Sequence, residues 1–236
     1  MMAVLERNSS LAQRVTRDLG EAILRGEFKQ GQSLPTEAKL CESFGVSRTA
    51  VREAVKMLSA KGLITSKPRQ GIKVQPSIEW NLLDSELLEW SLVSNPSMSV
   101  LKEYLQMRIA IEPEAASLAA RFGSEANIDK IGEALSRMKA SAEQGKSNLE
   151  ADIDFHINIL CASENRFYIH MRNFTRMALN VSISHTDDVK ADPIAVVEDH
   201  AKVYNAIKSG NAERAKNSMF LLIDEALTFV EQSLEE

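Results

Sequence analysis

Cysteine is scarce in this chain of 236 residues, since Cys41 and Cys161 are the only two and no Cys-x-x-Cys motif occurs. Reduced thiols in a cytoplasm are the simplest interpretation of two separate cysteines. No run of eighteen apolar residues is present, which excludes a membrane-spanning helix. The N-terminal stretch MMAVLERNSS lacks the long apolar region of a signal peptide. We therefore expect a cytoplasmic protein.

Motifs of common enzyme classes are also missing. The chain has no His-Glu-x-x-His pair, no Gly-rich phosphate loop and no general base paired at a usable spacing. Histidine is confined to the second half, at His156, His170, His185 and His200. Hydrophobic residues make up 44% of the chain, so a sizeable core can be buried. The length fits one large domain or two of ordinary size.

The net charge of −5 hides a difference between the two parts of the chain. Residues 1–76 contain 13 Lys and Arg against 7 Asp and Glu, a net charge of +6. The remaining residues contain 15 basic and 26 acidic side chains, a net charge of −11. A basic first segment joined to an acidic remainder is typical of a protein that binds DNA with low non-specific affinity.

The segment from Ser33 to Lys61 predicts two short helices joined by a tight turn. Pro35 and Thr36 suit the start of the first helix, and Gly45 permits its left-handed end. The buried stripe of the second helix is predicted at Ala50, Val51, Ala54, Val55 and Leu58. Off that stripe, the first turn and a half carries Ser47, Arg48, Thr49 and Arg52. A recognition helix presents these N-terminal positions to the major groove, where Arg binds guanine and hydroxyl groups bind bases or phosphates.

A basic hairpin is predicted directly after this segment. The strands Leu63–Thr65 and Ile72–Val74 flank a turn at residues 66–71. Its basic residues are Lys67, Arg69 and Lys73, which can contact phosphate or the minor groove as a wing does. The alternative is a surface helical hairpin with ordinary solvated charges. The order of helix, turn, Ser-Arg-Thr start and basic hairpin favours DNA binding.

The segment from Leu11 to Val74 resembles the winged helix-turn-helix of the GntR family of bacterial transcription regulators. The matching text is LPTEAKLCESFGVSRTAVREAVKMLSAKGLI followed by RQGIKV. The resemblance implies DNA contacts at Ser47, Arg48, Thr49, Arg52 and the wing residue Gly71. The family usually has arginine where this chain has Ala38, and Lys39 is the adjacent basic residue. We include Lys39 and Arg69 among the predicted DNA-binding residues.

The rest of the chain shows helical periodicity and little strand signal. A linking helix is predicted from Trp80 to Leu92, and its two tryptophans, Trp80 and Trp90, are expected to pack it onto the second domain. The further predicted helices are Met98–Phe122, Ser124–Gly145, Asn148–Ala162, Asn165–Thr186, Pro193–Ser209 and Asn211–Leu234. The predicted fold is mainly α: a winged helix-turn-helix with a small β-hairpin wing at residues 1–76, a linker helix at 77–97, and an all-α bundle of six to seven helices at 98–236.

Three side chains of the bundle suit a divalent transition metal. Asp152 and His156 are spaced i, i+4 and share one helix face, and His200 follows on a later helix. Carboxylate oxygen and imidazole nitrogen suit Zn, Ni or Mn. The alternative is a surface ion pair or a satisfied core histidine. Arg108 is a second candidate, because a buried guanidinium can bind a carboxylate, although it can also pair with Glu112 at i, i+4.

Residues Leu101 to Phe229 resemble the FCD effector-binding domain that follows the winged helix in the FadR-type subfamily. The resemblance implies a metal held by Asp152, His156 and His200, and an effector contact at Arg108. The family's last histidine falls at Leu222, so one ligand is missing. Water, the effector, His170 or His185 are alternatives for that position. The linker WNLLD…LEW and the missing histidine are similar to regulators of sugar-acid catabolism.

The leading hypothesis is a ligand-responsive transcription factor. We expect a homodimeric repressor on a palindromic operator, released by a small carboxylate such as a sugar acid. The alternative is an all-α metal-dependent enzyme with an accessory winged helix, in which the metal set activates water. A third interpretation is a structural adaptor, against which the +6 charge of the first 76 residues argues.

Overall fold

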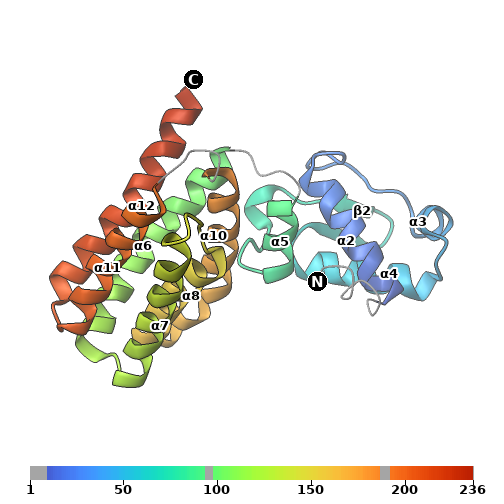
Figure 1. Ribbon diagram of the computed structural model, residues 1–236. Helices are drawn as coiled ribbons and strands as arrows, with labels where there is room; N and C mark the ends of the chain where they lie inside the picture. Colours follow the sequence, from blue (N-terminus) through green and yellow to red (C-terminus); the bar gives the residue numbers. More distant parts are fainter. Residues whose placement is uncertain (1–9, 94–97, 187–191, 236) are drawn as a thin grey trace. The chain divides into compact units, whose positions relative to one another are not determined.

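The computed structural model describes residues 10–93, 98–186 and 192–235. The chain divides into two compact units, Met1–Asn95 and Pro96–Glu236, each with its own core. Figure 1 shows the helices of both units along the chain. No helix in the described ranges is long and apolar enough to span a lipid bilayer.

The first unit is a small helical domain with one hairpin. Its helices are α2 (Leu11–Leu24), α3 (Glu37–Phe44), α4 (Arg48–Ala60), the 3-10 helix η2 (Ser77–Glu79) and α5 (Ser85–Val93). Its strands are β1 (Ile64–Lys67) and β2 (Gly71–Val74), paired antiparallel. Apolar side chains from every α-helix and both strands form one core cluster.

Local capping sets the helix-turn-helix geometry. The Thr36 hydroxyl accepts a hydrogen bond from the backbone of Lys39, and the Ser47 hydroxyl accepts one from Ala50, which satisfies free N–H groups at the starts of α3 and α4. Gly45 has φ 62°, a conformation that suits glycine at a helix end. The predicted stripe of α4 is confirmed at Val51, Ala54, Val55 and Leu58, which are buried.

The wing is a tight hairpin in which Ile64 pairs with Val74 and Lys67 pairs with Gly71. Both strands extend further toward the turn than the sequence predicted, so the turn is confined to residues 68–70. Arg69 and Gly71 adopt positive φ values of 65° and 75°. Ser33 also forms a bridge to Lys73, which ties the wing to the segment before α3.

Helix α5 packs into the first unit, so the prediction that its tryptophans pack onto the second domain is wrong. Trp90 belongs to the core cluster of the first unit, and Trp80 packs against the same cluster. The Trp90 ring fills the space over Gly20 on α2, which has no side chain. Lys61, only 8% exposed, lies over the same ring and forms ion pairs with Asp84 and Glu86. The predicted continuous linker helix is instead η2, a turn and α5.

Replacing Gly20 with alanine is expected to destabilise the first unit. The added methyl group would lie 2.6 Å from two Trp90 ring carbons, and Lys61 and the core hold that ring in place. Overpacking of this kind costs about 1–3 kcal/mol, which exceeds the gain of up to about 1 kcal/mol in helix propensity.

The measurement is thermal unfolding followed by tryptophan fluorescence, because both tryptophans of the chain lie in this unit. Asp18→Ala, at an exposed position of the same helix, is the matched control for helix propensity. A melting temperature for Gly20→Ala equal to or above that of the control would contradict the close packing.

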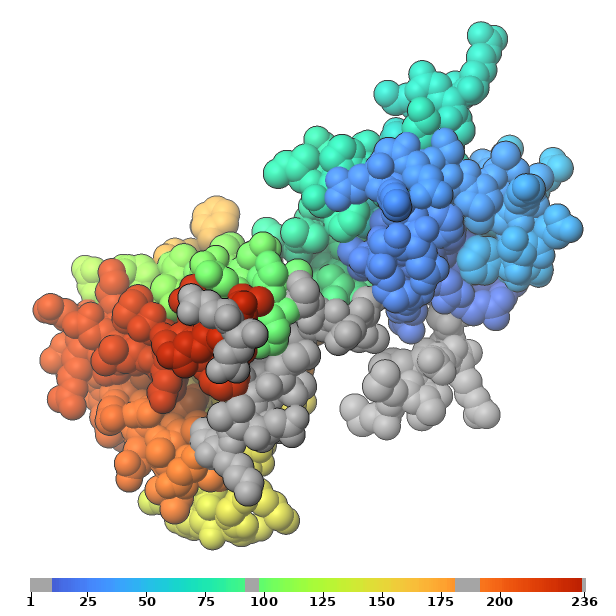
Figure 2. All heavy atoms as spheres, turned by 90° about the horizontal axis from the view of Figure 1, so that it is seen from above, coloured from blue at the N-terminus to red at the C-terminus, as the bar shows by residue number. Residues whose placement is uncertain are grey.

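The second unit is a helical bundle in the residues that the structure describes. Its helices are α6 (Met98–Phe122), α7 (Glu125–Ala142), α8 (Leu149–Ala162), α9 (Arg166–His170), α10 (Arg172–Thr186), α11 (Pro193–Lys208) and α12 (Ala212–Glu235). The long helices α6 and α12 run along each other, and Figure 2 shows α12, in red, against α6 in green and α11 in orange. One predicted helix, Asn165–Thr186, is two, because the chain turns at Met171 between α9 and α10.

Candidate functional site

The start of α4 presents polar side chains to solvent. Ser47, Arg48, Thr49 and Arg52 are exposed, while the opposite face of the helix is buried in the core. Arg52 is 66% exposed, and its Nε lies 3.0 Å from an Oε2 atom of Glu37 on α3. Among the described residues, the guanidinium group of Arg48 forms no hydrogen bond or ion pair that a DNA contact would have to displace. This arrangement fits a recognition helix that offers its first turns to a DNA groove.

The other predicted DNA-binding residues are also exposed. Lys39 lies on α3, and Arg69 and Gly71 lie at the tip of the wing. A β-carbon added at Gly71 would meet nothing within 4 Å, so the backbone there is open to a close partner. The first unit thus presents cationic side chains on both the helix-turn-helix and the wing.

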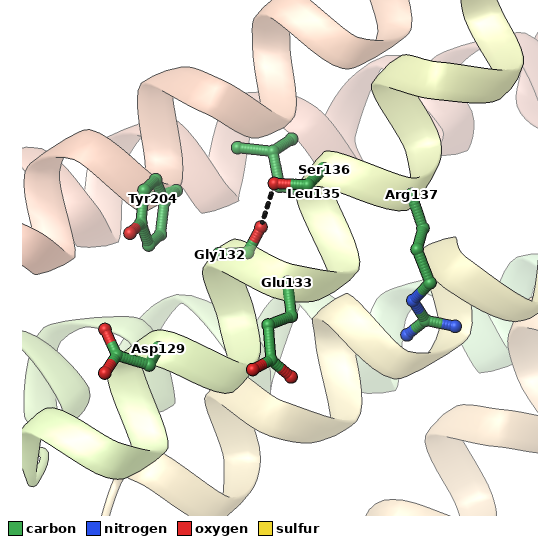
Figure 3. A pocket seen from close by; sticks show the side chains of 7 residues that line it. All are labelled: Asp129, Gly132, Glu133, Leu135, Ser136, Arg137 and Tyr204. Atoms are coloured by element: carbon green, nitrogen blue, oxygen red, sulfur yellow. Dashed lines mark hydrogen bonds between the residues drawn. The ribbon is translucent and has the colours of Figure 1, made fainter.

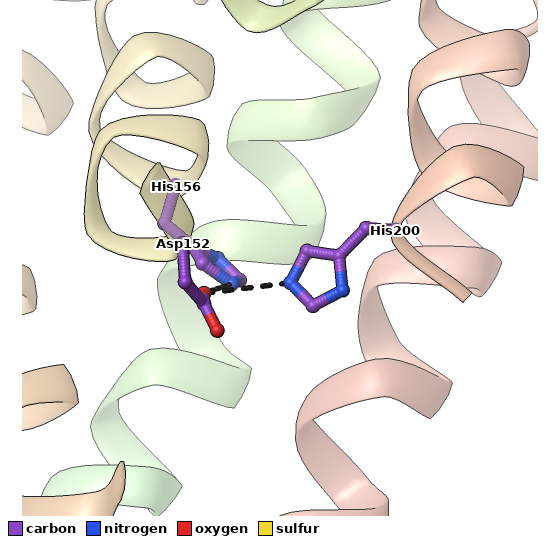
Figure 4. Close-up of side chains that lie close together, drawn as sticks. All are labelled: Asp152, His156 and His200. Atoms are coloured by element: carbon purple, nitrogen blue, oxygen red, sulfur yellow. Dashed lines mark ion pairs between the residues drawn. The ribbon is translucent and has the colours of Figure 1, made fainter. Parts of the chain in front are cut away.

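A cluster of three possible metal ligands lies inside the second unit. Asp152 and His156 come from α8 and His200 from α11, and their rings and carboxylate point toward one another (Figure 4). The ligand atoms all lie within 4.8 Å of one another. Both histidines are buried. The structure therefore brings together the three residues that the sequence predicted.

Hydrogen bonds fix the orientation of both imidazole rings. His156 Nδ1 lies 2.6 Å from Oε2 of Glu112, and a carboxylate can only accept, so this nitrogen donates its proton. His200 Nδ1 likewise donates to the Val196 carbonyl at 2.8 Å. With Nδ1 engaged in this way, the Nε2 atom of each ring faces Asp152, at 3.3 Å from Oδ1 for His156 and 3.4 Å for His200. Metal-binding histidines have this second-shell pattern.

The hydrogen bonding and the spacing of the cluster's ligand atoms both support metal binding. Asp152 Oδ1 and His200 Nε2 are buried and have no hydrogen-bond partner within the described residues. Unpaired buried polar atoms are costly, so two of them facing each other indicate a missing partner. Ligand atoms about 2.1 Å from one ion in a tetrahedral set lie about 3.4 Å apart, and the distances from Asp152 Oδ1 to the two histidines, 3.3 and 3.4 Å, are close to this value. The Asp152, His156 and His200 cluster can hold a metal.

Arg108 is buried on α6 and pairs with Glu112 one turn later. Its Nε lies 2.6 Å from one Glu112 oxygen and its Nη2 3.2 Å from the other. Burial alone would raise the pKa of Glu112, but the charge of Arg108 and the contact with His156 outweigh it and lower that pKa to about 2. The neighbouring histidines also lower the pKa of Asp152, against its burial. Both carboxylates are therefore ionised at neutral pH.

Arg108 therefore pairs with Glu112 and also lines the cavity, and its contact with an effector stays a prediction. The sequence predicts Glu112 only as a helix partner of Arg108. Its contact with His156 joins α6 to α8, and no spacing in the sequence indicates a contact between residues 44 positions apart.

The cluster opens into a cavity of about 910 Å³ between α8, α11 and α12. Leu222, at the position where the FCD resemblance expects the last histidine, lines this cavity. His170 is exposed at the end of α9 and belongs to no group of possible metal ligands among the described residues. The side chain of His185 lies outside the described part of the structure.

A second hollow, of about 700 Å³, lies on the surface between α7 and α11 (Figure 3). Its polar lining residues Asp129, Glu133, Ser136 and Arg137 are exposed. Arg137 is paired with Asp154, and the Ser136 hydroxyl donates to the Gly132 carbonyl. With its polar groups solvated or paired, this hollow is a poorer candidate for an effector site than the buried cluster.

Comparison with protein families identifies both units. The model of the "Bacterial regulatory proteins, gntR family" matches residues 11–74, and the model of the FCD domain matches residues 103–225. This chain belongs to the GntR family. It carries an FCD domain behind the winged helix-turn-helix, and it is a DNA-binding transcriptional regulator. The sequence-based prediction of the family and of both folds is confirmed.

Similar proteins cover most of the chain. "Uncharacterized HTH-type transcriptional regulator YieP" of Escherichia coli (strain K12) is 34% identical over 213 residues, which cover 89% of this chain and 91% of that protein. "Galactonate operon transcriptional repressor" of the same organism is 28% identical over 219 residues, 89% of this chain and 92% of that protein. These relatives are named as regulators, so the chain is not a metal-dependent enzyme.

The fold is also similar to a solved structure. "Streptococcus agalactiae GntR" has a TM-score of 0.52 and 19% sequence identity, and the match covers 92% of this chain and 99% of that one. This likeness concerns the fold alone. It agrees with the arrangement of a small winged helix-turn-helix and a helical bundle in one chain.

Proposed function

We propose that this regulator is a homodimeric repressor that a small carboxylate releases from a palindromic operator. The observation that carries the proposal is the buried cluster of Asp152, His156 and His200 with two unpaired polar atoms, next to Arg108 and open to a cavity. A relative is named as the repressor of the galactonate operon, which makes a sugar acid one candidate effector. Two recognition helices in a dimer would contact half-sites about one helical turn apart.

The residues around the cavity would have different roles in binding the metal and the effector. Asp152, His156 and His200 would hold a divalent transition metal such as Zn, Ni or Mn, and the bound ion would supply Lewis-acid bonding to carboxylate and hydroxyl oxygens. Glu112 fixes the tautomer of His156 through its 2.6 Å contact. Arg108 contacts Glu112 through Nε and Nη2, so its Nη1 atom would donate a hydrogen bond to the carboxylate of the effector.

Release requires that the effector distinguish two states of the protein. The cavity is lined by α8, α11 and α12, so a ligand between these helices favours one packing of the bundle. By linkage, the effector weakens operator binding only to the extent that it binds the DNA-free state more tightly. Coupling of this kind typically changes affinity about 5- to 150-fold.

The test is operator binding in the presence of carboxylates. The operator is first selected from random DNA with the purified protein, and its affinity is measured by fluorescence anisotropy with added Zn²⁺, Ni²⁺ or Mn²⁺. At least one carboxylate of a panel of hydroxy acids, dicarboxylates and sugar acids is expected to lower that affinity tenfold or more. A metal-loaded protein whose operator affinity and thermal stability respond to none of them would contradict the proposal.

A further inference from the structure

We infer that the cavity takes a carboxylate with a chelating polar head and an apolar tail, rather than a fully hydroxylated sugar acid. This inference rests on the proposed function, because it concerns the effector of the same site. It comes from the uneven distribution of polar and apolar groups around the cavity. The polar head and the apolar tail are considered in turn.

Buried polar groups of the cavity lie at one place. Arg108, Asp152, His156 and His200 line it together, and Glu112 contacts two of them from behind. This group offers a cation, two unpaired polar atoms and a possible metal position. One carboxylate with an adjacent hydroxyl group would satisfy it, because two neighbouring oxygens chelate one ion. The head of the effector is therefore a 2-hydroxy carboxylate or a similar chelating group.

Most described residues of the cavity wall beyond this group are apolar. Half-buried side chains, which leave surface free for a ligand, are Leu149 on α8, Val196 and Val197 on α11, and Leu222 and Phe229 on α12. The buried side chains Met138, Leu179 and Ile223 complete this wall. A ligand atom placed against it gains affinity by leaving water only if the atom is apolar.

Polar residues elsewhere on the cavity lining are already paired or exposed. The Asn148 side chain caps α8 and also donates to Ser141. Asp192 caps α11 through the backbone of Ile194, and Asp199 pairs with Lys202. The remaining ones, Lys146, Ser147 and Glu225, are exposed. Among the described lining residues, no buried polar side chain away from the cluster remains free to bind a hydroxyl group.

The grouping of the buried polar side chains and the apolar wall together favour a carboxylate with an apolar tail over a sugar acid. A six-carbon sugar acid bears hydroxyl groups along its whole length, and those placed against the apolar side chains would lose hydration without gaining a partner there. An aliphatic tail of the same length gains about fourfold in affinity for each methylene group that it buries. The cavity volume of about 910 Å³ leaves room for such a tail.

The experiment compares effectors that share a head and differ in the tail. Full-length protein loaded with one equivalent of Zn²⁺ is titrated calorimetrically with glycolate, 2-hydroxybutyrate, 2-hydroxyhexanoate, 2-hydroxyoctanoate and galactonate. Affinity is expected to rise along the aliphatic series by about fourfold per methylene. At equal carbon number, 2-hydroxyhexanoate is expected to bind at least tenfold more tightly than galactonate.

The outcomes separate this inference from the proposed function. A flat aliphatic series, or galactonate binding as tightly as 2-hydroxyhexanoate, would overturn the inference and leave the proposed function standing. Absence of binding by every compound would overturn both, because the cavity would then not be an effector site for carboxylates.

A pair of variants on α12 locates the tail. Leu222→Gln puts an amide into the apolar wall and is expected to weaken 2-hydroxyoctanoate about tenfold while leaving glycolate unchanged. Leu221→Gln is the matched control, since Leu221 is 65% exposed and is not among the cavity-lining residues. Val197→Thr, which keeps the side-chain volume, repeats the test on α11 in case Leu222→Gln disturbs folding. Equal effects of Leu221→Gln and Leu222→Gln, with no effect of Val197→Thr, would overturn the placement of the tail.

Discussion

Replacing Arg48 and Arg52 together with alanine is expected to lower the affinity for operator DNA at least about thirtyfold. Both side chains project from the start of α4, and neither contributes to the core. The loss of an arginine that contacts a guanine costs about 1–3 kcal/mol, so two such losses amount to about 2–6 kcal/mol. The fold should be unaffected, because within the described residues the only ion pair lost is the exposed one between Arg52 and Glu37.

Fluorescence anisotropy with operator and with random DNA, at one fixed salt concentration, measures the effect. Arg25→Ala is the control for loss of an arginine away from α4, because it removes one positive charge from the end of α2, where Arg25 pairs with Glu21 and Glu27. We expect that control to lower binding to both DNAs slightly and equally. If the double variant kept its preference for the operator, α4 would not be the recognition helix.

Asp152→Asn is expected to weaken metal binding at least a hundredfold. Asp152 Oδ1 faces the Nε2 atoms of both histidines, so this carboxylate is the common member of the ligand set. The amide has nearly the same shape but loses the negative charge, and it is a poor ligand for a transition metal. The loss should exceed the 10- to 100-fold effect typical of second-shell residues.

Calorimetric titration with Zn²⁺ and the visible spectrum of the Co²⁺-loaded protein measure this change. Asp154→Asn is the control on the same helix, since Asp154 is 35% exposed and pairs with Arg137 and Arg176. That variant should bind metal as the unaltered protein does. Unchanged metal affinity in Asp152→Asn, or an equal loss in Asp154→Asn, would show that the cluster is not the metal site.

The winged helix-turn-helix could be predicted from the sequence because contacts between nearby residues set its geometry. Thr36, Gly45 and Ser47 each act within four residues of their own position, so their type and spacing are enough to place the ends of α3 and α4. Asp152 and His156 were predictable for the same reason, as residues one helical turn apart. His200 lies on a different helix, so no spacing in the sequence places it beside them, and the packing of α11 brings it there.

What the sequence did not reveal depends on contacts between distant segments. Glu112 reaches His156 only because α6 packs against α8. The two tryptophans were assigned to the second domain because the helical pattern of the linker does not say which unit it packs against. Gly20 on α2 leaves room for the Trp90 ring, and so lets α5 pack against the first unit. A glycine alone gives little indication in the sequence that an aromatic ring will pack over it.

The ion pairs of Lys61 determine where this protein can be divided. A fragment that ended at Pro76, the boundary suggested by the sequence, would lack Asp84, Glu86 and Trp90, so Lys61 would lose both ion pairs and its contact with the tryptophan ring. It would also uncover the part of the core that Leu87 and Trp90 close. An autonomous DNA-binding fragment therefore has to include α5, and hybrid regulators that exchange sensor domains should be joined after Val93.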